Sequence, residues 1–310
     1  MTGVQTCALP IYGDIIIHGG VITAVGDDHC AGIGSNDGKT TGAITIYGGT
    51  VNATGGSNSA GISGGRYSNA GSIAIYDGTV TATGKDDAAA IGGGDGDKGE
   101  GNASEIVICG GTVTATGADA SAAIGGGDGG EGQGSASEIF IGGGTVTAAT
   151  TGAGAAIGGA DYGTAKVTIR GGVVKATASG SGKGIGGGSK LSSDTSAITL
   201  GYTDVTGEGI SITASSFSGK VTLEKAFFNK SGTYSTGDVD SQNISKLAGN
   251  ALRAWDGTAE TWAQLQDKIR GASSGSTIVL DQDYTALDSD VALYVPADRT
   301  LTIDLNGFTL

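Results

Sequence analysis

A short apolar alternation that returns at nearly constant intervals limits what this chain of 310 residues can fold into. Its copies begin at Ile15, Ile44, Ile73, Ile106, Ile139, Val167 and Ile198. Successive copies are 29, 29, 33, 33, 28 and 31 residues apart. A period of about 20–50 residues is typical of solenoids and repeat arrays. Each copy contains strand patterns and no helical pattern, so it predicts one turn of a solenoid built from strands.

The copy at residues 106–127, IVICGGTVTATGADASAAIGGG, divides into three strands. Apolar residues alternate with others at 106–108 and 112–116, and a third short apolar piece at 122–124 ends in glycines. A period of two indicates a strand, and Gly–Gly pairs indicate turns. We therefore predict an all-β fold, a parallel β-helix whose three-strand coils of about 28–33 residues stack on one another.

The same alternation predicts which side chains fill the interior. Three inward columns are expected, namely Ile22, Val51, Val80, Val113, Val146 and Val174; Ala24, Ala53, Ala82, Ala115, Ala148 and Ala176; and Ile33, Ile62, Ile91, Ile124, Ile157 and Ile185. One coil buries three or four large side chains, worth roughly 1.5–3 kcal/mol each. Ordering its residues costs roughly 1–2 kcal/mol per residue. A single coil is therefore unstable, and stability depends on stacking between neighbours.

The composition excludes two classes of partner. The chain has 31 acidic and 17 basic residues, a formal net charge of −14, and no basic stripe that could bind nucleic acid. It contains no apolar run of about eighteen residues, so no segment of it is predicted to span a membrane. Three cysteines do not make a disulfide framework. Cys30 and Cys109 fall three coils apart, which is too far for a disulfide.

The repeat divides the chain into four segments. Residues 1–11, MTGVQTCALPI, do not fit the repeat and resemble a translated sequencing-library adapter, so we predict that they are an artefact of assembly and not native. Residues 12–215 contain the β-helix repeats. Residues 216–250 are predicted to close the open end of the stack, because an exposed sheet edge invites aggregation. Residues 251–310 are predicted to be the truncated start of a second β-helix.

This last segment contains the one helix that the sequence predicts. Residues 261–270, TWAQLQDKIR, place Trp262, Leu265 and Ile269 on one face, and Gly271 follows at the position of a C-terminal cap. The helix is expected to cap the second β-helix. Strands are predicted after it at 277–280, 292–295 and 301–305.

Three motifs resemble known families. GGTVTATG followed by AAIGGG resembles the repeats of large bacterial cell-surface β-helix proteins, some of them described as carbohydrate-binding-domain-containing. ISITASSFSGKVTLEKAFF is similar to the closing segment of such arrays. TWAQLQDKIRGASSGSTIVLDQDY, with LTIDLNGFTL, resembles the opening of a pectate-lyase-like β-helix. The resemblance implies a right-handed β-helix in an extracellular, wall-associated protein with an adhesive or glycan-binding role.

The outward position after the first strand of each coil supplies the candidate glycan site. His18, Tyr47 and Tyr76 occupy this position in three successive coils, and stacked aromatic rings make a platform for a sugar ring. The alternative is a structural one, in which the tyrosines are exposed members of a strand ladder without a ligand. In the fourth coil, Cys109 takes the same position.

Two acidic loops supply the candidate metal site. The sequences GGDGDKGEGNASE and GGDGGEGQGSASE place Asp95 next to Asp128 and Glu105 next to Glu138, with Asp97 and Glu131 nearby. Like charges on neighbouring strands repel, and Ca²⁺, which takes about six to eight oxygen ligands, would offset that repulsion. We predict Asp95, Asp97, Asp128 and Glu131 as possible Ca²⁺ ligands. The alternative is a solvated loop without metal.

Outward threonines form columns that suggest another activity. These are Thr50, Thr79, Thr112 and Thr145; Thr81, Thr114 and Thr147; and Thr54, Thr83 and Thr116. A flat face of regularly spaced threonines could order water, as in ice-binding solenoids. Asn52, Ala149, Val173 and Lys175 interrupt the columns, and threonine is in any case a good strand former. We favour that structural explanation.

Catalytic patterns are weak. His18 and His29 have no Ser or Cys partner at a recognisable spacing. Lys166, Arg170 and Lys175 form a basic spot near Asp161 without paired carboxylates. We therefore predict a non-enzymatic module of the bacterial cell surface, a monomeric rigid spacer or adhesin that contacts a polysaccharide weakly and at many points. The alternative is a fragment of a polysaccharide-acting lyase or hydrolase.

Overall fold

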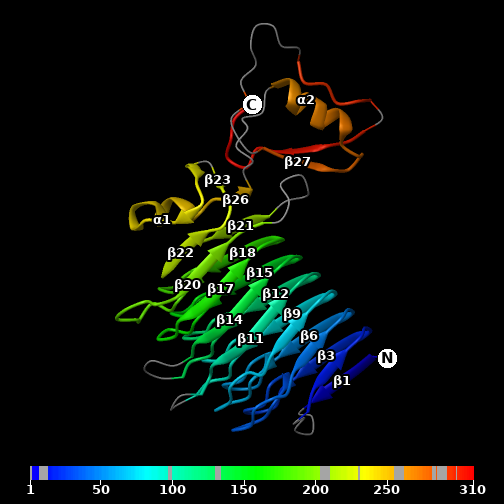
Figure 1. Ribbon diagram of the computed structural model, residues 1–310. Coiled ribbons are helices and arrows are strands. Elements are labelled where there is room, and N and C mark those ends of the chain that lie inside the picture. The colour runs from blue at the N-terminus through cyan, green and yellow to red at the C-terminus, as the bar shows by residue number, and fades with distance from the viewer. Residues whose placement is uncertain are drawn as a thin grey trace.

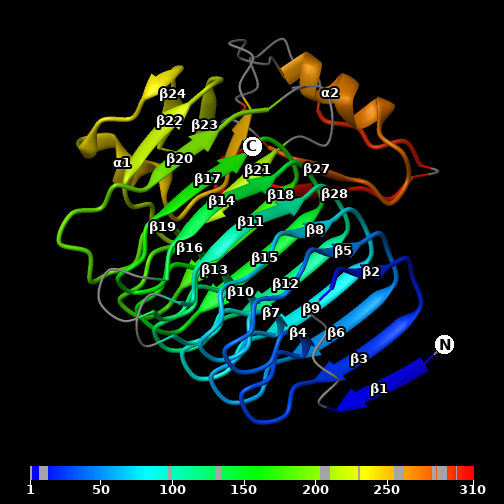
Figure 2. The same ribbon diagram turned by 60° about the horizontal axis from the view of Figure 1, so that its bottom comes forward.

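The predicted parallel β-helix is the fold of the chain (Figure 1). The structure, a computed structural model, describes residues 2–6, 13–96, 100–129, 134–202, 210–229, 231–254, 262–280, 284, 292–297 and 299–310. Three sheets run along the solenoid axis, and each of the first six coils contributes one strand to each of them. Figure 2 shows the coils wound around a common interior. The coils wind in a right-handed sense, as expected.

Each sheet is built from equivalent strands of successive coils. Sheet A contains, in spatial order, β1 (Thr2–Thr6), β3 (Val21–Val25), β6 (Thr50–Thr54), β9 (Thr79–Thr83), β12 (Thr112–Thr116), β15 (Thr145–Thr150), β18 (Val173–Ala178), β21 (Ser211–Ala214), β26 (Leu252–Ala254), β23 (Phe227–Asn229) and β24 (Gly232–Tyr234). Sheet B contains β2 (Ile15–Ile17), β5 (Ile44–Ile46), β8 (Ile73–Ile75), β11 (Ala103–Ile108), β14 (Ala136–Ile141), β17 (Ala165–Ile169), β20 (Ala197–Leu200), β22 (Lys220–Leu223) and β25 (Gly237–Asp238). Sheet C contains β4 (Ile33–Gly34), β7 (Ile62–Ser63), β10 (Ile91–Gly92), β13 (Ile124–Gly125), β16 (Ile157–Gly158) and β19 (Ile185–Gly186).

The register of the strands confirms the inward columns. Val113 pairs with Val80 on one side and Val146 on the other, and all three are fully buried. The alanine and isoleucine columns are buried in the same way, and they join the paired isoleucines of sheet B in one continuous core. Ile22, in the first coil, is only partly buried. The interior is therefore a stack of like side chains, each covered by its equivalent in the neighbouring coils.

Sheet C requires glycine at its second position. Gly125 has a φ of 138°, which L side chains rarely adopt, and a Cβ atom at this residue would lie 1.9 Å from the carbonyl oxygen of Gly158. Ser63 holds the same position in the second coil with a φ of 106°. The repeated IG dipeptide is thus explained by the close approach of consecutive coils.

Short polar side chains add bonds between coils where the turn into sheet B begins. The Asn102 amide N–H donates to Asn69 Oδ1 (2.9 Å), and the Ser135 N–H donates to Asn102 Oδ1 (2.9 Å). The Thr164 N–H continues the series by donating to Ser135 Oγ (3.1 Å). Each side chain thus satisfies a partly buried backbone donor of the next coil.

The closing segment ends the parallel stacking. β26, which lies just past the boundary predicted at residue 250, pairs antiparallel with β21 and with β23. β23 forms a hairpin with β24, and β25 pairs antiparallel with β22. The helix α1 (Ser241–Leu247), which the sequence interpretation missed, lies between β25 and β26. Asp240 caps it by accepting hydrogen bonds from the N–H groups of Gln242 and Asn243. The Tyr234 hydroxyl bonds the Lys246 carbonyl oxygen (3.1 Å) and so ties α1 to the hairpin.

The first residues extend sheet A. Thr2–Thr6, which fall outside the sequence repeat, form β1 and pair in parallel with β3. This pairing uses backbone groups and makes little demand on side-chain identity, so the adapter origin of residues 1–11 stays a prediction. Cys7 and Pro10 lie outside the described residues.

The C-terminal segment has its own small core. The helix α2 (Trp262–Gly271) is close to the predicted range, and Leu265 and Ile269 pack with Leu280 and Tyr284. β27 (Thr277–Val279) and β28 (Thr302–Asp304) pair in parallel. The strand expected at 292–295 is not formed: the Gln266 side chain instead bonds both the N–H (2.6 Å) and the carbonyl oxygen (2.9 Å) of Tyr294. The Gln266 amide thus makes the two backbone hydrogen bonds with Tyr294 that a neighbouring strand would make.

Candidate functional site

A line of planar side chains follows the corner where sheet B turns into sheet A. His18, Tyr47 and Tyr76 stand directly after β2, β5 and β8, as the sequence predicts. The imidazole and the Tyr47 ring have centroids 5.2 Å apart and planes 6° apart. The Tyr47 and Tyr76 rings are also 5.2 Å apart, with planes at 9°. We call these three residues the aromatic ladder.

The backbone ladder fixes the position of these rings. The Tyr47 N–H donates to the Ile17 carbonyl oxygen, and the Tyr76 N–H donates to that of Ile46, both at 2.8 Å. The isoleucines of β5 and β8 are buried, so the residue that follows each strand points outward at the corner. Tyr47 and Tyr76 remain 49% and 46% exposed. The ladder is therefore a rigid, solvent-facing set of rings.

Stacking limits which ring surfaces a ligand can reach. The Tyr47 ring has His18 on one face and Tyr76 on the other. Tyr76 is covered on one face only, because the equivalent residue of the next coil, Cys109, has no ring. The structure adds how the predicted platform of stacked rings is presented: the ladder offers ring edges and phenol hydroxyls along its length, with an aromatic face at the end where Cys109 follows.

The same corner continues with residues that the sequence interpretation did not include. Gly142 stands at the ladder position of the fifth coil, and a Cβ atom there would lie 2.8 Å from a ring carbon of Phe140. The Phe140 ring thus occupies the space that the glycine leaves. The sequence FIG contains a signal for this arrangement. Its glycine holds the position that Tyr or His holds in the first three coils, and a large aromatic residue stands two positions before it.

A charged pair completes the line. Arg170 occupies the ladder position of the sixth coil and binds Glu224 through two hydrogen bonds, Nε–Oε2 at 2.8 Å and Nη2–Oε1 at 2.5 Å. The Glu224 carboxylate lies over Gly201, the equivalent position of the next coil. Hydrogen bonding to Glu224 raises the pKa of Arg170 above its ordinary value. We call the whole set from His18 to Glu224 the corner column.

The acidic loops have protein partners where they are described. Asp95 accepts a short hydrogen bond from the Asn58 side-chain amide. Glu105 pairs with Glu138 as expected, and Lys166 Nζ lies 2.9 Å from Glu138 Oε1, which offsets their repulsion without a metal. The described residues contain no group of three or more His, Cys, Asp or Glu that could hold a metal ion.

Two of the four residues that we predicted as Ca²⁺ ligands, Asp97 and Glu131, lie outside the described part of the chain. Asp95 and Asp128 follow Gly92 and Gly125, which pair with each other, so these two carboxylates occupy equivalent turns of adjacent coils. The calcium site therefore stays a prediction.

Two of the basic residues predicted to lie near Asp161 form separate ion pairs with other carboxylates, Lys166 with Glu138 and Arg170 with Glu224. Asp161 is 1% exposed and pairs with Lys190, Nζ–Oδ2 at 2.6 Å, instead of with Lys166 or Arg170. Lys190 also lies 5.1 Å from the centre of the Tyr162 ring. Arg66 forms a similar pair with Asp37 (2.8 Å) and lies 4.5 Å from the ring of Tyr67. These cations are already neutralised by carboxylates.

The threonine columns are in register on sheet A. Thr112 pairs with Thr79 and Thr145, and Thr114 pairs with Thr81 and Thr147. The interruptions lie where the sequence places them, since Asn52 pairs with Thr81 and Lys175 with Thr147. Ice binding stays a lesser alternative, because a regular threonine face is also what a stable strand ladder produces.

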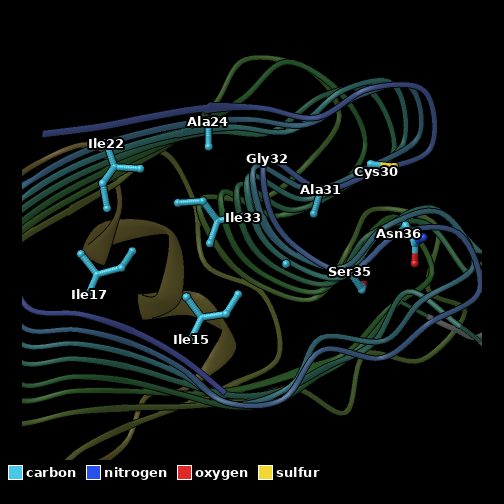
Figure 3. Close-up of a pocket in the computed structure, with 11 residues that line it drawn as sticks. Ile15, Ile17, Ile22, Ala24, Cys30, Ala31, Gly32, Ile33, Ser35 and Asn36 are labelled. Carbon is cyan, nitrogen blue, oxygen red and sulfur yellow. The ribbon is translucent and has the colours of Figure 1, made fainter. Parts of the chain in front are cut away.

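A cavity of about 120 Å³ opens at the first coil. Its lining is mainly apolar, and Figure 3 shows Ile15, Ile17, Ile22 and Ile33 pointing into it. These side chains belong to the inward columns, and β2 and β4 are terminal strands of sheets B and C. The cavity is thus the end of the core, and we assign it no ligand.

Comparison with known proteins supports the architecture. A family model described as a β-helix repeat matches residues 15–37, 44–66, 73–95, 106–128 and 167–189. No curated protein and no solved structure matches the chain. The chain thus contains β-helix repeats, and each matched segment runs from a sheet B strand to the turn after sheet C. None of the described helices is long and apolar enough to cross a membrane.

Proposed function

We propose that this protein is a non-enzymatic, extracellular surface module that binds a polysaccharide along its corner column. The exposed stack of His18, Tyr47 and Tyr76 is the observation that supports this function most strongly. Solvent-facing aromatic residues that are held rigidly lose little conformational entropy when a ligand binds. The rings bring apolar area together with hydroxyl groups, a combination that suits sugars, which have both C–H faces and hydroxyls.

The charge of the molecule favours a neutral glycan. A net charge of −14 repels an anionic polymer at low ionic strength. Arg170, the cation of the corner column, is neutralised by Glu224 at hydrogen-bonding distance. A neutral chain of sugars avoids this repulsion, and it can still exchange hydrogen bonds with the charged pair. An anionic polymer would need a bridging cation such as Ca²⁺. The acidic loops could hold that cation, so an experiment on glycan binding must compare Ca²⁺ with EDTA.

Rigidity is the second part of the proposed function. Each coil repeats the same contacts with its neighbours, so the corner column keeps a fixed spacing of roughly 4.8 Å per coil. A polymer that runs along the axis can contact several coils at once, and weak contacts then add to a useful avidity. The alternative is a fragment of a polysaccharide-acting enzyme, whose catalytic groups would have to lie elsewhere in a longer protein.

Affinity electrophoresis of the whole chain tests this proposal. The gels contain neutral polysaccharides (a mixed-linkage β-glucan, a mannan, a xylan) or anionic pectate, each with CaCl₂ and with EDTA. We expect retardation by a neutral glycan that is insensitive to EDTA, and less retardation after Tyr47→Ala and Tyr76→Ala. Tyr294→Ala is the matched control, because Tyr294 is exposed and lies outside the corner column.

Two results would contradict the proposal. One is equal mobility of the chain in every gel. The other is the release of new reducing or unsaturated ends from the polysaccharides during incubation, which would show the enzyme alternative. Retardation by pectate that EDTA abolishes would move the binding site from the ladder to the acidic loops.

A further inference from the structure

The corner column has one position without a planar group. Imidazole, phenol and phenol occupy the first three coils, the Phe140 ring covers the fifth, and the Arg170–Glu224 pair occupies the sixth and seventh. The fourth coil has only Cys109, which is exposed and forms no disulfide. We call the space over Cys109, between Tyr76 and Phe140, the notch.

We propose that the notch binds a single hexopyranose ring of a neutral, β-linked glycan. This proposal rests on the proposed function and assigns it a specific subsite. The face of Tyr76 toward Cys109 is the one face of the two tyrosines that no other ladder ring covers. It is therefore the place where a sugar can make a face-to-face contact. Along the rest of the ladder, a ligand meets ring edges.

The dimensions of the notch suit a ring. Tyr76 and Phe140 belong to the third and fifth coils, so their positions are two coils apart, roughly 9–10 Å along the axis. A flat molecule between two rings needs about 3.5–4.0 Å of contact distance on each side, or roughly 7–8 Å in total. The distance between the two positions, roughly 9–10 Å, exceeds the roughly 7–8 Å that a flat molecule needs. The excess accommodates a pyranose ring, which is thicker than an aromatic ring. A tyrosine at position 109 would fill the same space.

The surroundings specify the chemistry of the ligand. A β-linked gluco-configured ring has equatorial hydroxyls and axial hydrogens, so it can place a C–H face on the open face of Tyr76 while its hydroxyls point to the sides. Asp77, which follows Tyr76, is exposed and accepts a hydrogen bond from Gly78 (2.7 Å). Asp77 is therefore a polar group beside Tyr76 that can bond such a hydroxyl, whereas the Arg170–Glu224 pair lies beyond Phe140 and outside the notch. An α-linked glucose ring has an axial linkage oxygen at C1, which holds one of its C–H faces away from an aromatic ring.

Calorimetric titration of the whole chain with cellohexaose, and with maltohexaose for comparison, tests the notch. We expect Cys109→Ser to change the Kd by less than about twofold, whereas Cys109→Tyr, which completes the ladder, raises it by about tenfold or more. Maltohexaose is expected to bind more weakly than cellohexaose. Cys109→Tyr is expected to fold, because tyrosine stands at this position in the second and third coils. Its circular dichroism and melting temperature check this.

Alkylation of the thiols gives a second readout that needs no substitution. Iodoacetamide is added with and without saturating cellohexaose, and the modification of each cysteine is measured by peptide mass mapping. We expect slower modification of Cys109, while Cys30 in the first coil is unaffected. If cellohexaose binds, but Cys109→Tyr leaves the Kd unchanged and cellohexaose does not slow the alkylation of Cys109, the notch is not the binding site. The proposed glycan binding would then still stand. If neither the hexasaccharides nor any polysaccharide binds, the proposed function itself fails.

Discussion

The repeated coils and the closing segment are held together by different interactions. In the coils, backbone ladders join identical strands, and columns of Ile, Val and Ala fill the interior. In the closing segment, Phe227 packs edge-on against Tyr202, with ring centroids 5.2 Å apart, and Tyr234 bonds Asn229 and the Lys246 carbonyl oxygen. The coils thus rely on repetition and the closing segment on specific contacts, so we expect changes in the two regions to have different consequences.

The largest effect is expected from Phe227→Ala in the closing segment. Phe227 is fully buried, and removal of a buried Phe side chain costs about 3–5 kcal/mol. Because Phe227, Tyr234 and Leu247 join β23, β24 and α1 to the end of the core, we expect the loss of the Phe227 ring to detach these elements at lower urea concentration than the coils. Limited proteolysis across a urea series, together with circular dichroism of the sheets, measures the two events separately. Lys225→Ala, at an exposed site, is the control. A single transition that shifts as a whole would show that the two regions are not independent.

Ile108→Ala tests the dependence of the coils on neighbours. Ile108 is 0% exposed and is covered by Ile75 and Ile141, so we expect a loss of about 2–5 kcal/mol in the free energy of unfolding. Ile17, in the same column but in the first coil, is 7% exposed and borders the cavity. Ile17→Ala should therefore cost clearly less. Urea denaturation monitored by circular dichroism compares the two variants, and equal losses would contradict a stack in which position along the axis matters.

Ser63→Gly is expected to stabilise the protein. Ser63 replaces the glycine of sheet C and has a φ of 106°, and its buried hydroxyl has no hydrogen-bond partner among the described residues. Strained backbone and an unsatisfied buried hydroxyl each cost on the order of 1–3 kcal/mol. The flexibility of glycine in the unfolded chain offsets part of the gain, so we expect a net increase of about 1 kcal/mol. A lower denaturation midpoint for this variant would refute the role that we assign to glycine in this column.

The smallest effect is expected at Asp238. Hydrogen bonds from Thr222 (2.7 Å) and Lys220 lower the pKa of the Asp238 carboxyl below its ordinary value. The stabilisation is therefore present above the pKa of an unfolded Asp, about 3.9, and is lost as the pH falls through the folded value. Asp238→Asn should lower the melting temperature slightly at pH 7, and this difference should shrink as the pH falls through the folded pKa of Asp238. A difference that grows toward acid pH would contradict this assignment.

The sequence predicts the coils well because each one repeats the same physical demand. Val113 is inward for the same reason as Val80 and Val146, so each copy confirms the others. Helix α1 has no such repetition. Its signal is local, with Asp240 as N-cap and Ile244 and Leu247 three residues apart, and the alternation of the preceding segment concealed it. Where the repeat ends, secondary structure can no longer be predicted by comparing equivalent positions in neighbouring coils.

The candidate site was predicted in part. The alternation places His18, Tyr47 and Tyr76 in one outward column, which their ring stacking reproduces. The covered ring faces could not be foreseen, because they depend on side-chain rotamers. Phe140 was missed for a similar reason, since its backbone position differs from the ladder position and its ring reaches it only because Gly142 has no side chain.

The central claim is that the corner column contacts a glycan, and tyrosine-selective NMR tests it most directly. The chain is labelled with ¹³C in its tyrosine rings, the signals are assigned by single Tyr→Phe substitutions, and cellohexaose is added stepwise. We expect saturable shifts of Tyr76 and Tyr47 that follow one dissociation constant, while Tyr162 and Tyr294 do not move. Binding that shifts other tyrosines and leaves Tyr76 and Tyr47 unchanged would contradict the claim.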